Sequence, residues 1–127
     1  MLNAVIKKQW AEMILDNIKG DEYRAMNAYW APRFRKEVGA EEFLRALTGK
    51  PTNKTYKIRY QVGYAKDCTV FVVTFRLRTG YGKVEWGAVE GEKYFIIGIE
   101  SFEVIRRKKN SNPCRLAENT GGRECLS

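Results

Sequence analysis

Hydrophobic and polar residues alternate along the middle of the chain. Within Thr55–Tyr64, every second residue is apolar or aromatic, an alternation typical of a half-buried strand. A short turn leads into a second strand, Thr69–Arg78, where Val70 and Val72 make the second face apolar as well. We therefore expect part of this second strand to be covered on both sides.

Two more strands are predicted after a glycine-containing turn. The first is Val84–Ala88, and the second is long, running from Tyr94 to Val104. Gly98 lies inside this last strand, where a missing side chain indicates a bulge or a bend. Together these segments predict four strands in antiparallel meander order.

Before Thr55 the apolar spacing becomes helical. Apolar residues recur at three- and four-residue steps from Asn3 to Lys19, which predicts an amphipathic helix capped by Gly20. Asp21 is then expected to cap a second helix that ends near Pro32. A third, short helix follows Gly39, with its apolar side formed by Phe43, Leu44 and Leu47. The pattern thus predicts an α+β fold, with N-terminal helices packed on a curved antiparallel four-stranded sheet.

Length and charge add a domain boundary and a candidate surface. With 127 residues, 44% of them hydrophobic, the chain fits one domain, predicted to span 1–110 and to be followed by a flexible tail, 111–127. The formal net charge is +8. A basic patch could bind nucleic acid or an acidic protein, although a solvated strand end is the alternative. The patch would comprise Arg33, Arg35, Lys36, Arg106, Arg107, Lys108 and Lys109.

Residue counts argue against several kinds of chemistry. The chain has three cysteines without CxxC spacing and no histidine, so neither a metal site nor a cofactor is expected. The missing histidine also removes the commonest general base. No stretch is long and apolar enough for a membrane span, and we expect a cytoplasmic protein with no membrane partner.

The order of elements resembles the nuclear transport factor 2-like (SnoaL-like) superfamily, which has a cone-shaped, cystatin-like α+β fold. The resemblance covers residues 3–109 and depends on the element order and the stretch GDEYRAMNAYWAP, Gly20–Pro32. It implies a ligand held between the helices and the concave sheet. Members include isomerases, dehydratases, hydrolases, transport factors and non-catalytic dimerisation modules, so the resemblance does not select one function.

Two sets of residues are candidates for a site. Glu100 shares strand parity with apolar neighbours and would suit a buried general base, with Tyr60 as a hydrogen-bond donor. The alternative is that a bulge turns Glu100 outward to pair with Arg76 or Arg78. A second set, the aromatic residues Tyr23, Trp30, Tyr60 and Trp86, could line a pocket for an apolar small molecule, or could simply form core.

These observations leave three hypotheses. The first is a homodimer formed through the sheet, acting as a small-molecule-binding or interaction module, with Val70 and Val72 in the interface. The second is an isomerase- or dehydratase-type enzyme that uses Glu100 and a tyrosine. The third is a protein that binds nucleic acid or an acidic protein through the basic patch.

Overall fold

A curved five-stranded sheet forms the body of the protein. The structure, a computed structural model, describes residues 1–107. The strands are β1 (Leu2–Ile6), β2 (Asp21–Ala25), β3 (Tyr56–Val62), β4 (Val70–Tyr81) and β5 (Lys93–Arg106). Their order in the sheet is β1-β3-β4-β5-β2, and every pair is antiparallel except β1 with β3. The predicted α+β class, with helices on a curved and largely antiparallel sheet, is confirmed, and the sheet has five strands rather than four.

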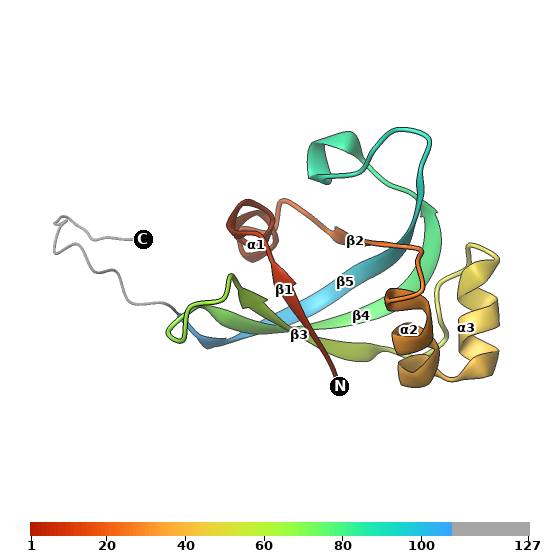
Figure 1. Ribbon diagram of the computed structural model, residues 1–127, viewed down its shortest axis with the longest axis horizontal. Helices are drawn as coiled ribbons and strands as arrows, with labels where there is room; N and C mark the ends of the chain where they lie inside the picture. The colour runs from red at the N-terminus through yellow and green to blue at the C-terminus, as the bar shows by residue number, and fades with distance from the viewer. Residues whose placement is uncertain (108–127) are drawn as a thin grey trace, which may run out of the picture.

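Three helices accompany the sheet (Figure 1). They are α1 (Lys8–Leu15), α2 (Trp30–Val38) and α3 (Ala40–Leu47). Helices α2 and α3 lie side by side at one end of the sheet, whereas α1 lies toward the other end. The third predicted helix is confirmed as α3, but its buried side is formed by Phe43 and Ala46, whereas Leu44 and Leu47 of the predicted apolar side are exposed.

The first predicted helix, from Asn3 to Lys19, is wrong at both ends. Its first residues form β1, which pairs with β3 so that Leu2, Ala4 and Ile6 lie beside core residues of that strand. Helix α1 ends at Leu15 in a Schellman motif, in which the N–H of residue 18 donates to the Met13 carbonyl at 2.8 Å. Asn17 adopts the left-handed conformation, with φ of 60°, and thus takes the capping role predicted for Gly20.

The second predicted helix is also wrong, because Asp21–Ala25 is the edge strand β2. Helix α2 begins only after Asn27, whose side-chain oxygen accepts a hydrogen bond from the Trp30 N–H at 3.0 Å. Pro32 does not end a helix but lies in the first turn of α2, where a missing N–H costs no intrahelical hydrogen bond.

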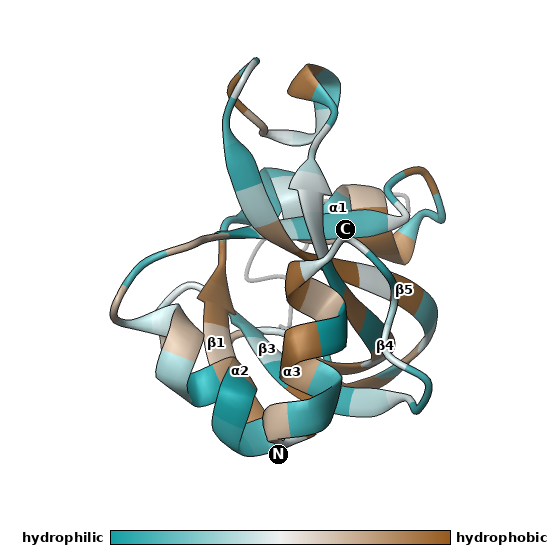
Figure 2. Cartoon of the chain, turned by 90° about the vertical axis from the view of Figure 1, so that its right-hand side faces the viewer, coloured by the Kyte–Doolittle hydropathy of each residue, from teal (hydrophilic) through white to brown (hydrophobic). Residues whose placement is uncertain are grey.

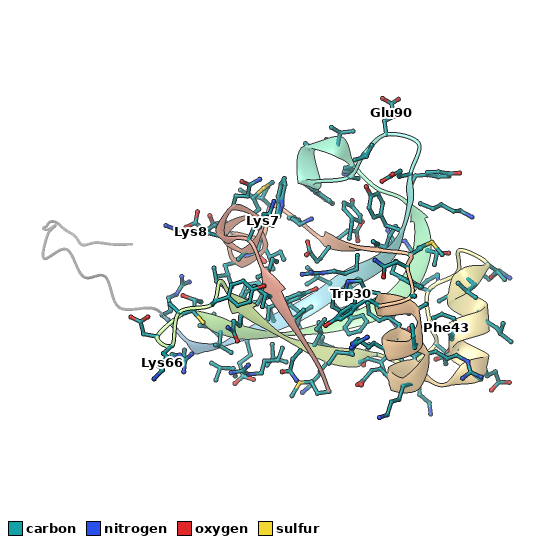
Figure 3. The ribbon with its side chains drawn as sticks, viewed as in Figure 1. Lys7, Lys8, Trp30, Phe43, Lys66 and Glu90 are labelled. Atoms are coloured by element: carbon teal, nitrogen blue, oxygen red, sulfur yellow. The ribbon has the colours of Figure 1, made fainter. Side chains whose placement is uncertain are left out.

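The predicted strand Val84–Ala88 is a short 3-10 helix, η1 (Val84–Trp86), in the long connection between β4 and β5. Gly87 turns the chain after it with φ of 104°, and a Cβ at this position would lie 3.0 Å from the Trp10 ring. This connection, with Glu90 near its tip, rises above the sheet on the side of β2 and α1 (Figure 3). We call residues 82–92 the hairpin loop.

The core lies between the concave face of the sheet and the helices (Figure 2). Aromatic residues fill much of it, and each fully buried large side chain contributes roughly 1.5–3 kcal/mol to stability. The large side chains with 0–1% exposure include Phe34, Ile58, Tyr60, Phe71, Phe75, Leu77, Phe95 and Ile97. The centre of the cone is therefore packed with the protein's own side chains. The predicted tail, 111–127, lies outside the described residues.

Candidate functional site

Two inward-facing charged residues on β2 are the most unusual feature of the interior. Glu22 and Arg24 lie beside the core residues Ile97 and Phe95 of β5 in the sheet register, so they share the concave face. Glu22 is 5% exposed, and its carboxylate pairs with Arg24 at 2.9 Å and with Lys19 at 3.3 Å. Each charge thus has an opposite charge within reach, which offsets the cost of burial.

The ammonium of Lys19 lies in a cage of aromatic rings. Its side chain has no exposed surface, and Nζ lies 4.6 Å from the centroid of Tyr23, 5.4 Å from that of Trp10 and 5.9 Å from that of Trp86. Nζ also donates a 2.7 Å hydrogen bond to the Trp86 carbonyl. Burial lowers the pKa of Lys19, and the charge of Glu22 opposes that shift.

Arg24 lies against two further aromatic rings. Its guanidinium carbon lies 5.2 Å from the centroid of Trp30 and 5.5 Å from that of Tyr60, and Nη2 donates to the Val5 carbonyl at 3.1 Å. Within the described chain, Arg24 Nε and the Tyr60 hydroxyl are both buried without a hydrogen-bond partner. Burial raises the pKa of Tyr60 far above its ordinary value, so this hydroxyl stays protonated.

The four aromatic residues predicted to bind a small molecule form two pairs, each around a cation of the chain itself. Tyr23 and Trp86 enclose Lys19, whereas Trp30 and Tyr60 enclose Arg24. Two basic side chains of the chain itself thus lie against the rings that were expected to contact an apolar ligand, and ligand binding by these rings stays a prediction. Sequence reasoning missed the charged residues because apolar periodicity does not register charges that are buried as pairs.

An open pocket lies at the end of α1. Its volume is about 380 Å³, within the range of small-molecule sites. The α1–β2 connection and the middle of β5 form its walls. The lining residues are Ile14, Asn17, Lys19, Gly20, Ile99, Glu100, Ser101 and Phe102. We call this cavity the α1–β5 pocket.

A bulge in β5 places polar groups at this pocket. Thr74 pairs with Ser101 and Phe75 with Ile99, which leaves Glu100 as the extra residue. The predicted irregularity is thus confirmed, two residues beyond Gly98. The bulge lets Glu100 and Ser101 meet the pocket next to the apolar Ile99 and Phe102.

Glu100 is exposed, which corrects the expectation of a buried general base. Its side chain is 47% exposed and Oε2 pairs with Arg76 Nε at 2.7 Å, as in the alternative interpretation. Tyr60 is completely buried and does not line the pocket. The two residues predicted to act together in catalysis therefore do not share one site.

The predicted basic patch is divided between two ends of the molecule. Arg33, Arg35 and Lys36 belong to α2. Arg106 is the last residue of β5 and Arg107 follows it, at the end of the sheet away from α2 (Figure 1). Arg106 is tied down by a 3.0 Å hydrogen bond from Nε to the Cys68 carbonyl. Lys108 and Lys109 lie outside the described residues. The five described residues do not form one surface.

Residues 1–107 offer neither a metal site nor a helix that could cross a membrane. That part of the chain holds no group of three or more His, Cys, Asp or Glu side chains arranged to bind a metal ion. None of its helices is long and apolar enough to cross a membrane.

Comparisons with known proteins add no family. A scan against protein-family models finds no match, and searches of curated proteins and of solved structures find none either. The resemblance to the nuclear transport factor 2-like superfamily therefore stays a prediction.

Proposed function

We propose that this protein is a non-catalytic module that binds a small molecule in the α1–β5 pocket. The single observation that supports the proposal is the shape and lining of that pocket. It combines a volume of about 380 Å³ with apolar and polar lining residues, supplied by the end of α1, the α1–β2 connection and β5. Large side chains such as Phe34, Tyr60 and Phe71 are fully buried in the core, outside the lining of this pocket.

The lining indicates the chemistry of the ligand. Ile14, Ile99 and Phe102 offer apolar contact, and Asn17 and Ser101 offer hydrogen bonds. Glu100 supplies a carboxylate, of which Oε2 is held by Arg76 while Oε1 has no protein partner among residues 1–107. The ammonium of Lys19 is engaged inside its cage. These groups suit a small, mainly apolar molecule with a hydrogen-bond-donating or cationic end.

The other hypotheses receive less support. An isomerase or dehydratase would need a base shielded from water, and Glu100 is half exposed and paired. Binding of nucleic acid would need the basic residues on one surface, and those described lie at two ends. Both remain predictions without a site.

A homodimer through the sheet likewise remains a prediction. Val70, one of the two residues that motivated it, is only 1% exposed within the single chain. Val72 lies on the outer face, between Arg59 of β3 and Glu103 of β5. Light scattering at micromolar concentration tests the dimer, and a purely monomeric protein would exclude it.

The experiment for the pocket is a fragment screen followed by protein NMR. We expect small amines that carry an aromatic or aliphatic ring to shift the amide signals of Asn17, Gly20 and Ser101 together. Ser101→Leu, which places an apolar side chain at the rim, should weaken these shifts. Shifts scattered over the surface, or unchanged in Ser101→Leu, would contradict the proposal.

A further inference from the structure

The cage around Lys19 is built from parts that do not depend on Lys19. Trp10 comes from α1, Tyr23 from β2 and Trp86 from η1, so three separate elements supply the rings. The Tyr23 hydroxyl accepts a hydrogen bond from the Lys83 N–H at 2.9 Å, and its ring lies 5.7 Å from that of Tyr94. The hydroxyl and the ring of Tyr23 therefore each have a contact that does not involve Lys19.

The remaining walls are held in the same way. Gly87 packs against the Trp10 ring so closely that a Cβ there would lie 3.0 Å from it, and the ammonium of Lys83 lies 4.2 Å from the Trp86 ring centroid. The carboxylate of Glu22 keeps a second partner, Arg24, at 2.9 Å. Each wall thus has a contact that would persist if the lysine side chain were removed.

We propose that this cage is a binding site for a primary amine, which the native chain fills with its own Lys19. The rings attract the positive charge through their π faces. The Trp86 carbonyl accepts a 2.7 Å hydrogen bond from the amine, and the Glu22 carboxylate pairs with its charge at 3.3 Å. A quaternary ammonium has no N–H to donate, so the same geometry disfavours it. An external amine can enter only where Lys19 is displaced.

When Lys19 occupies the cage, it also holds the hairpin loop against β2. Lys19 is joined to the loop through the Trp86 carbonyl and to the sheet edge through Glu22. The cage adjoins the α1–β5 pocket, because Lys19 belongs to both, but none of the three cage rings lines that pocket. The inference does not rest on the proposed function, because the signals of Trp10 and Trp86 report the cage whereas those of Asn17 and Ser101 report the pocket.

The test is chemical rescue of Lys19→Ala by n-propylammonium, which replaces the atoms removed beyond Cβ. We expect the thermal midpoint of the variant to rise with amine concentration, with the unfolding constant about 100-fold lower at 100 times the dissociation constant. In NMR spectra the indole N–H signals of Trp10 and Trp86 should shift, whereas that of Trp30 serves as an internal reference. Tetramethylammonium and 1-propanol should have much weaker effects.

Lys19→Met is the matched control, because its apolar side chain fills the cage and should leave no room for the amine. If Lys19→Ala does not fold alone, it is refolded with n-propylammonium or with 1-propanol, and recovery only with the amine supports the proposal. An equal response to amine and alcohol, an equal response of Lys19→Met, or no response of the variant to either compound would overturn it.

Discussion

Arg24 on β2 donates a 3.1 Å hydrogen bond to the backbone carbonyl of Val5 on β1. These two strands are the opposite edges of the sheet, yet one side chain joins them. The sheet therefore curves until its edges approach each other, and the gap contains ion-paired side chains instead of a strand ladder. Glu22 holds Arg24 in place from the same strand.

Replacement of Arg24 should show how much its contacts with Val5 and Glu22 contribute to the free energy of unfolding. Arg24→Met leaves the Val5 carbonyl without its donor and removes one of the two partners of Glu22. Loss of one partner from a buried ion pair costs about 3 kcal/mol of unfolding free energy. Urea denaturation measures this loss of unfolding free energy.

Arg33→Ala, which removes an exposed guanidinium 3.6 Å from the Tyr29 ring centroid, is the control and should cost under about 1 kcal/mol. Equal losses would contradict a structural role for Arg24.

The buried hydroxyl of Tyr60 should add nothing to stability at neutral pH. It has no hydrogen-bond partner in residues 1–107, so Tyr60→Phe removes a desolvated polar atom without breaking a bond. We expect the free energy of unfolding at pH 7 to stay equal or to rise by up to about 1 kcal/mol. A loss above that value in urea denaturation would show that the hydroxyl is bonded.

The Tyr60 hydroxyl should also make the free energy of unfolding depend on pH in the alkaline range. Burial raises the pKa of Tyr60 in the folded state, whereas in the unfolded chain it titrates near 10. Above pH 10 the unfolded state loses this proton and the folded state keeps it, so stability falls with pH by about 1.4 kcal/mol per unit. Tyr60→Phe should lack this contribution. Parallel stability curves for both proteins from pH 9 to 11 would contradict burial of the hydroxyl.

The hairpin loop is packed on β2 through Gly82. A Cβ at this position would lie 2.6 Å from Cζ of Tyr23 and 2.8 Å from the Cβ of Ala88. Gly82→Ala should therefore displace the loop and cost roughly 1–3 kcal/mol, with a change in near-ultraviolet circular dichroism. At Gly20 a Cβ meets no atom within 4 Å, so Gly20→Ala is the matched control. Similar stabilities of the two variants would show that the loop does not pack on Tyr23.

The sheet was predictable where strands follow a simple alternation. Strand β3 lies within the predicted Thr55–Tyr64, and β5 contains the predicted Tyr94–Val104. Strand β1 was missed because its five residues continue into an apolar helical spacing, and its partner β3 is distant in sequence. Strand β2 was missed because its inward residues, Glu22 and Arg24, are charged. Hydrophobic patterning treats such residues as exposed.

The sequence indicated which aromatic residues matter, but not how they are arranged in the fold. The predicted rings form two pairs, Tyr23 with Trp86 around Lys19 and Trp30 with Tyr60 around Arg24. The cations that lie against these rings could not be predicted, because Lys19 and the Trp86 carbonyl that it contacts are 67 positions apart in sequence. The α1–β5 pocket depends on the left-handed Asn17 and on the position of the bulge, both of which follow from tertiary structure.

The most direct test of the proposed function is the affinity of one screened amine for three proteins. These are the wild type, Glu100→Gln and Glu103→Gln, the last being a neighbouring exposed carboxylate outside the pocket lining. We predict that calorimetric titration gives equal affinities for wild type and Glu103→Gln. Glu100→Gln should bind about tenfold more weakly, which corresponds to 1.4 kcal/mol for a charge-assisted hydrogen bond. Equal affinity for all three proteins would contradict binding in the α1–β5 pocket.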